Sequence, residues 1–415
     1  MQQTHAMKNA ILLLLIFFTL TVKAQSDSII ESNPKTETPK FKPFSNYKMG
    51  KGILLSSNTD STFQLKVRAR MQNRLTYYVN DGEANELDPQ IRRLRLRFEG
   101  FIGNPKFEYN VQFGFATNDI GLVPEKKYIN IIRDVMLYYK PNKNWKFGLG
   151  QTKLPGNRER INSSGALQLT DRSINNAEFN LDRDLGIQAQ YQHLLKDKFS
   201  YVLAGAISTG EGRNKFKFND LGLAYTGKLE LLPFGTFKNE GQYFEGDLAR
   251  EVNPKLMISA AYSYNHKASR TKGQMGYDLY TPTNIKSLFL DAIFKYKGWA
   301  FMYAYLNRNA DEIFTYNPNN LAAMQYVYVG YGQDFQASYT FKNQYEIVGR
   351  FSHQKVDKNI FQFKPNTNQW SLGLNKYFYG HALKLQLEET YEQLKYFNAN
   401  AKNNWYTRFQ IEIAL

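Results

Sequence analysis

The feature that most constrains this chain is an alternation of apolar and polar residues with a period of two, repeated in segments of about ten residues. From Lys106 to Phe115, every second residue is aromatic or aliphatic, and the residues between them are polar or glycine. The last segment, Trp405 to Leu415, alternates in a similar way. A β-strand with one apolar and one polar face has this period. Because the pattern recurs from about Phe63 onward, the sequence predicts an all-β fold.

Only one run, Ile11 to Val22, is apolar enough to suggest a membrane helix, and at about a dozen residues it is too short to span a bilayer. The mean hydropathy of -0.53 also argues against a bundle of transmembrane helices. The run follows basic Lys8 and precedes small residues at an export-peptidase site, so we interpret it as a signal peptide cleaved between Ala24 and Gln25. We therefore expect a signal peptide over 1–24, a flexible, proline-containing segment over 25–47 and a transmembrane β-barrel over 48–415.

The connections between segments favour a transmembrane barrel over a soluble β-sandwich, because short turns alternate with long polar stretches and aromatic residues gather at segment ends. Short connections are expected at Asn104-Pro105, Asn142–Asn144 and Lys342–Gln344, and long, extracellular ones at Val79–Gln90, Gly156–Asp182, Thr271–Asn284 and Ile313–Tyr326. Removing 24 residues from 415 leaves 391, which suits an antiparallel barrel of about 16 strands but not a plugged one of about 22. The expected location is the outer membrane of a Gram-negative bacterium.

Three arginines on one face of a single segment give the strongest functional signal. Arg93, Arg95 and Arg97 alternate with apolar residues, and the segment before it carries arginines in one phase as well. An arginine that faces lipid at mid-membrane costs roughly 2–4 kcal/mol, so these side chains are expected to face the lumen. Rows of basic side chains are how anion pores select their ions. We expect an anion-binding, pore-lining arginine ladder made of Arg68, Arg70, Arg74, Arg93, Arg95 and Arg97.

Two other interpretations of the basic residues stay open. Lumenal carboxylates can neutralise the ladder and leave a channel with little selectivity. Arg92 differs from Arg93 in its phase, which places it to contact lipopolysaccharide phosphates. The acids that could neutralise the ladder are Glu99, Glu108, Asp291, Glu388 and Glu412.

The long connection Gly156–Asp182 is a second candidate site. It carries Arg158, Arg160 and Arg172, and connections of this length are usually functional or disordered. We expect it to fold into the barrel and to constrict the channel, with an ordinary surface loop as the alternative.

Five stretches of this sequence form a recognisable set, namely Arg92–Gly100, Gly150–Pro155, Ser163-Ser164, Thr170–Ser173 and Asp182–Gln188. Together they resemble the phosphate-selective porins O and P. The resemblance implies a 16-stranded outer-membrane barrel, usually a homotrimer, with an inward-folded loop and a lumenal arginine ladder that helps anions across. Arg93, Arg95 and Arg97 match the arginine-rich strand of that pattern.

The sequence thus predicts a porin for the passive diffusion of small anions such as phosphate, in contact with outer-membrane lipid and lipopolysaccharide. The alternatives are a general or structural porin and, less favoured, a barrel hydrolase. No hydrolase or nucleotide-binding motif accompanies Ser163, Ser164 or the histidines, and neither a cofactor nor a metal is expected. The net charge of +16 also suits nucleic-acid binding, but export removes the protein from that partner. The histidines of the mature chain are His193, His266, His353 and His381.

Overall fold

The computed structural model describes residues 49–56, 62–117, 119–122, 129–215 and 222–415. The expected signal peptide and the expected flexible segment over 25–47 lie outside the described residues. Within the described part of the chain, no helix is long and apolar enough to cross a membrane.

Sixteen antiparallel strands of the described residues close into a β-barrel, as the sequence predicts. Each strand pairs with its neighbours along the chain, and the short strand β1 (Ile53–Ser56) pairs with the beginning of the first barrel strand. The barrel strands are β2 (Phe63–Val79), β3 (Glu86–Ile102), β4 (Phe107–Gly114), β7 (Ile132–Tyr139), β8 (Trp145–Lys153), β9 (Arg183–His193), β10 (Ser200–Ser208), β11 (Ala224–Leu232), β12 (Lys255–Arg270), β13 (Asp278–Tyr296), β14 (Trp299–Ala310), β17 (Gly330–Thr340), β18 (Tyr345–Val356), β19 (Asn366–Tyr377), β20 (Leu383–Lys395) and β21 (Lys402–Ala414).

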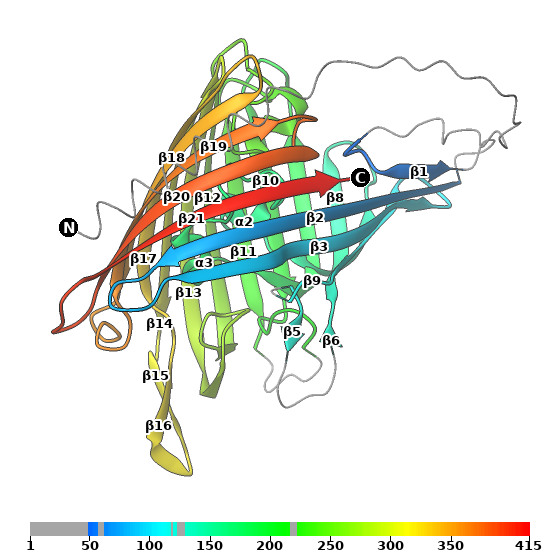
Figure 1. Cartoon of the computed structure of the whole chain (residues 1–415). Coiled ribbons are helices and arrows are strands. Elements are labelled where there is room, and N and C mark those ends of the chain that lie inside the picture. Colours follow the sequence, from blue (N-terminus) through cyan, green and yellow to red (C-terminus); the bar gives the residue numbers. More distant parts are fainter. Residues whose placement is uncertain (1–48, 57–61, 118, 123–128, 216–221) are drawn as a thin grey trace, which may run out of the picture. The chain divides into compact units, whose positions relative to one another are not determined.

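The barrel closes where the first strand meets the last one. Strand β2 pairs with β21 in a register that runs from Arg70 opposite Ala414 to Val79 opposite Trp405, and its other edge pairs with β3. Figure 1 shows this seam, with the blue β2 beside the red β21. Closure leaves no open sheet edge. A sheet in a bilayer must have none, because water is absent there and cannot satisfy the backbone N–H and C=O groups of an unpaired edge.

The distribution of side chains is inverted relative to a soluble protein. Leu137, Ile187 and Leu372 are 64%, 61% and 60% exposed on the outside, whereas Lys384 and Glu412 are fully buried inside the barrel. A soluble sandwich buries its apolar face instead. The period-two pattern is therefore that of a wall with lipid on one side and a polar lumen on the other.

The two ends of the barrel differ in their connections. The turn end has short ones, including 103–106, 140–144, 297–298 and 341–344, and the three short connections expected from the sequence are among them. At the loop end, connection 154–182 is long, and connection 311–329 contains the hairpin of β15 (Phe314–Asn317) and β16 (Asn320–Tyr326), which projects from the wall in Figure 1.

Two of the expected long connections are shorter than predicted. The chain between β2 and β3 is only 80–85, and that between β12 and β13 is 271–277. Strand pairing there continues beyond the membrane, since β2 and β3 have 17 residues each and β13 has 19, whereas about ten residues span the bilayer. The polar composition that suggested loops at Val79–Gln90 and Thr271–Asn284 belongs in part to these solvated strand ends.

We predict that Leu149→Arg, at the middle of β8 and 58% exposed, destabilises the barrel by roughly 2–4 kcal/mol, because it places a charge in hydrocarbon. The measurement is reversible urea unfolding in lipid vesicles, with Leu149→Ala as the control for lost apolar area. Equal stability of the two variants would contradict a lipid-facing position.

Candidate functional site: the basic wall of the lumen

The arginines of β2 and β3 lie directly opposite one another. The register pairs Arg68 with Arg97 and Arg70 with Arg95, and all four side chains line one cavity of the lumen. Like charges directly opposite each other in a sheet are destabilising. These pairs therefore need carboxylates from elsewhere in the fold.

A β-bulge changes the direction of Arg92. Gln72 pairs with Arg93, but the next residue of β2, Asn73, pairs with Ile91, so Arg92 is the extra residue of β3. Both Arg92 and Arg93 consequently point into the barrel, and an Arg92 Nη2 lies 2.7 Å from an oxygen of Asp171. The expectation that Arg92 faces lipopolysaccharide is therefore wrong.

The connection 154–182, here called the inner loop, folds into the barrel, as expected for Gly156–Asp182. It contains two short helices, α2 (Arg158–Ile161) and α3 (Ile174–Phe179). Carboxylates of the wall formed by β13, β17, β18 and β20 accept hydrogen bonds from it. The donors and acceptors are Arg158 N to Asp291 (3.1 Å), Asn175 Nδ2 to Asp334 (2.9 Å), Gln168 Nε2 to Glu346 (2.7 Å) and Thr170 N to Glu388 (2.8 Å).

Apolar packing and a helix cap fix the inner loop further. Phe179, at the end of α3, is fully buried, and its ring lies 5.5 Å from that of Tyr328. Ser173 caps α3 by accepting a hydrogen bond from the N–H of Asn176, and Glu159 accepts one from the N–H of Ser173. These contacts hold the polar side of the loop toward the arginines of β2 and β3.

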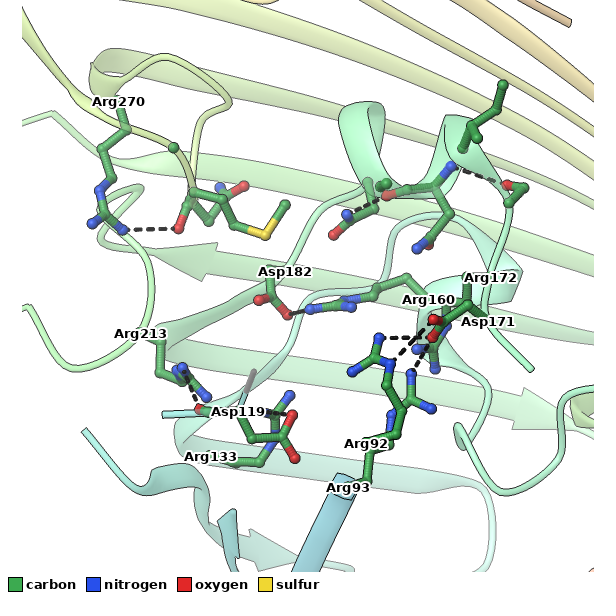
Figure 2. A pocket seen from close by; sticks show the side chains of 18 of the residues that line it. Arg92, Arg93, Asp119, Arg133, Arg160, Asp171, Arg172, Asp182, Arg213 and Arg270 are labelled. Carbon is green, nitrogen blue, oxygen red and sulfur yellow. Dashed lines mark hydrogen bonds and ion pairs between the residues drawn. The ribbon is translucent and has the colours of Figure 1, made fainter. Parts of the chain in front are cut away.

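Asp171 of the inner loop joins three guanidinium groups. It forms ion pairs with Arg74, Arg92 and Arg93, the last at 2.8 Å, and Figure 2 shows Arg92 and Arg93 converging on it. Burial opposes its ionisation, but the charges of Arg93, Arg92 and Arg74 lower the pKa of the Asp171 carboxyl well below the usual value. The Asp171 carboxylate therefore stays ionised at neutral pH.

A second group of contacts, here called the neck, lies beside Asp171 and joins Arg70, Arg95, Ser164 and Asp119. Arg70 Nη2 and Arg95 Nη1 donate to the hydroxyl of Ser164 at 2.6 and 2.8 Å. Asp119, from the connection between β4 and β7, binds Arg95 at 2.7 Å and Arg133 at 2.8 Å. Two opposed arginines thus meet one loop serine at this level of the barrel.

The neck lies between two cavities, and Arg95 lines both. The loop-side cavity has a volume of about 820 Å³ and the turn-side cavity about 850 Å³. Among the described residues, ten basic and five acidic side chains line the first, and ten basic and three acidic side chains line the second. Both cavities therefore carry an excess of positive charge.

The structure brings most of the predicted site residues to these cavities. Arg93, Arg95, Arg160 and Arg172 line the loop-side cavity, and Arg68, Arg70, Arg95 and Arg97 line the turn-side cavity. Arg74 is buried against Asp171, and Arg158 packs against Met302 of β14, so neither lines either of these two cavities. Sequence reasoning missed Arg133, Lys153, Arg183 and Arg213, since each stands alone rather than in a row of arginines.

Only some of the suspected neutralising acids pair with the ladder. Glu99 binds Arg68 at 3.3 Å and Arg97 at 2.7 Å, and Glu412 lies 3.5 Å from Arg70. Glu108 instead pairs with Lys140, whereas Asp291 and Glu388 hold the inner loop. The acids that pair with Arg74, Arg93 and Arg95 come from connections, namely Asp171 and Asp119.

The arrangement offers ion and hydrogen-bond chemistry rather than a nucleophile with a base. Ser164 is bound by two arginines, whereas the histidines contact Tyr201, Asn284, Asn368 and Phe244. In the described part of the chain, no group of three or more His, Cys, Asp or Glu side chains is placed to hold a metal ion.

A closed barrel with a lipid-facing apolar exterior, a polar lumen and an inward loop is the fold of outer-membrane porins and points to a channel rather than to an enzyme. The chain belongs to the family of phosphate-selective porins O and P, which matches residues 63–410 and confirms the resemblance seen in the sequence.

Solved structures of other outer-membrane proteins share the fold. The outer membrane channel DcaP of Acinetobacter baumannii is 10% identical over 87% of this chain and 100% of its own, with a TM-score of 0.54. OmpF of Salmonella typhi, in complex with daunomycin, is 12% identical over 85% of this chain and 98% of its own, with a TM-score of 0.50. No curated protein matches the chain.

We predict that Asp171→Asn frees the inner loop from the basic wall, because removing one partner of a buried ion pair costs on the order of 3–5 kcal/mol. The chain has no cysteine, so a single Ala166→Cys in the buried part of the loop reports loop opening through its rate of maleimide labelling. Labelling should rise by about tenfold or more.

The matched control for this experiment is Asp278→Asn. That carboxylate lines the same cavity but its side chain is 69% exposed, and its ion pairs with Arg270 and Lys215 are long, at 3.5 and 3.7 Å. Its labelling rate should equal that of the parent. Equal rates in all three proteins would show that Asp171 does not hold the loop.

Proposed function

We propose that this porin lets small anions, phosphate or related oxyanions among them, diffuse passively across the outer membrane in preference to cations. The observation that carries the proposal is the position of Arg95, which lines both cavities and binds the inner loop beside Arg70. On this view a solute that crosses the barrel passes these guanidinium groups, and a positive potential along the path favours anions.

The positions of four lumenal carboxylates support this preference. Asp291, Asp334, Glu346 and Glu388, which lie on β13, β17, β18 and β20, use their oxygens to bind the inner loop. They are buried there and do not line the turn-side cavity, where basic side chains outnumber acidic ones by ten to three among the described residues. The acids therefore stabilise the constriction instead of cancelling the charge of the basic wall.

The neck also offers a chemical route for an oxyanion. Arg70 and Arg95 donate to the Ser164 hydroxyl, which occupies the place that an anion oxygen takes when it accepts from the same guanidinium N–H groups. Exchange between hydroxyl and anion keeps binding reversible, which conduction requires. We propose that an anion meets Arg160 and Arg172 of the inner loop and the five ladder arginines that line the cavities, namely Arg68, Arg70, Arg93, Arg95 and Arg97.

A general porin of low selectivity is the second candidate, and one observation favours it. Each of the six ladder arginines has a carboxylate partner, and Glu99 serves two of them. If these pairs screen the ladder fully, the channel has no ion preference. A homotrimer, contact with lipopolysaccharide and export by a cleaved signal peptide remain proposals that rest on the family resemblance and the N-terminal sequence.

The test is the reversal potential of the purified protein in a planar bilayer under a chloride gradient. We expect anion preference, a several-fold lower anion-to-cation permeability ratio in Arg95→Gln/Arg97→Gln, and a smaller chloride current when phosphate is added. The control is Lys358→Gln/Lys364→Gln, which removes the same charge from exposed positions between β18 and β19.

Each outcome of this test points to one candidate. A channel without ion preference would mean that the carboxylates cancel the ladder and that the protein is a general porin. Anion preference that persists in the double arginine variant would place selectivity elsewhere in the lumen. The absence of any channel would leave the structural and hydrolase alternatives.

A further inference from the structure

One connection at the turn end is much longer than its neighbours. The residues between Leu232 of β11 and Lys255 of β12 number 22, whereas β13 and β14 are joined by Lys297 and Gly298 alone. This turn segment, residues 233–254, contains the short 3-10 helix η1 (Lys238–Tyr243). A connection that only reverses the chain does not need this length.

The turn segment lies inside the barrel. Buried Lys295 of β13 donates to the carbonyl oxygens of Gly241 at 2.8 Å and Gly246 at 2.6 Å. The hydroxyl of Tyr243 donates to Glu230 of β11 at 2.7 Å. Five of its side chains are buried, namely Phe237, Gln242, Glu245, Asp247 and Glu251.

The turn segment and the inner loop enter from opposite ends and meet. The N–H of Gln168 in the inner loop donates to Glu245 of the turn segment at 2.8 Å. A Cβ placed on Gly246 would lie 2.2 Å from an oxygen of Glu346 and 2.7 Å from the amide nitrogen of Gln168. The fit leaves no room for a side chain at this position, so the two segments pack closely here.

The contact between the turn segment and the inner loop determines where the lumen stays open. The turn-side cavity is lined by strands β2–β11, the inner loop, residues 236–244 of the turn segment and the chain end Ala414–Leu415. Among the residues that the structure describes, none from β12 to β20 lines it. The turn segment and the inner loop therefore cover that part of the wall together, with Lys295 and Glu346 against the turn segment and Lys384 against the inner loop.

We infer that residues 233–254 form a second constriction element, which closes one side of the lumen from the turn end and confines solutes to the basic wall. The part of the wall that the turn segment covers has mixed charge, with Lys295 bound to Gly241 and Gly246 and Glu346 against Gly246. Water and ions that reached it would widen the path and weaken the positive potential. The effect on ion preference rests on the proposed function, but the effect on conductance does not.

The experiment replaces residues 238–246 with a short Gly-Ser linker and keeps Asp247, whose carboxylate accepts from the N–H groups of Glu251 and Gly298 and so supports the adjoining turn. We expect a single-channel conductance at least about twofold higher, with lower anion preference. Folding is checked by circular dichroism and by the heat-dependent mobility of the barrel on gels. A folded variant with unchanged conductance would overturn the inference.

A pair of point variants covers the case in which the shortened chain does not fold. Lys295→Met removes two of the hydrogen bonds that hold the turn segment, while Lys238→Met makes the same change at an exposed position of that segment. Current transitions to a higher conductance should appear in the first variant and not in the second. Equal traces in both would overturn the inference. Raised conductance in a channel without ion preference would support the inference while the proposed anion preference fails.

Discussion

Pairing of the first strand with the last is the constraint on which the rest of this structure depends. Hydrocarbon cannot satisfy backbone N–H and C=O groups, so the sheet must close on itself, and β2 does this by pairing with β3 on one edge and β21 on the other. Once the ring is closed, each strand has one face toward lipid and one toward the lumen. The polar half of every alternating segment becomes the interior, and the chemistry of the channel is the chemistry of that half.

Within the ring, carboxylates that accept hydrogen bonds have two different roles. Along β2 and β3 they reduce repulsion between arginines that the register places opposite each other, as Glu99 does for Arg68 and Arg97. On β13, β17, β18 and β20, acids such as Glu388 bind backbone and side-chain groups of the inner loop. The cavities therefore keep an excess of positive charge, while these other acids hold the inner loop that fills the lumen.

The lumen is shaped by two segments as much as by the strands. The inner loop enters from the loop end and the turn segment from the turn end, and Gln168 and Glu245 join them. Buried polar contacts are stabilising only when their groups are paired, which explains why both segments are bound at many points by wall side chains. The open space that remains lies along β2 to β11 at the turn end.

The sequence by itself determined the fold class, the approximate strand number and the lumenal direction of Arg93, Arg95 and Arg97, whereas at Gly156–Asp182 it left a surface loop open beside an inward one. It could do so because a two-residue period is a local property and because the cost of a charge in lipid decides which face is outside. Only the tertiary structure decided that Arg92 turns inward, since a bulge depends on how β3 registers against β2. It alone decided that Asp171, 79 residues from Arg92, is its partner. It also decided that 233–254 lies in the lumen, because a polar connection has the same composition whether water or the opposite wall satisfies its polar groups.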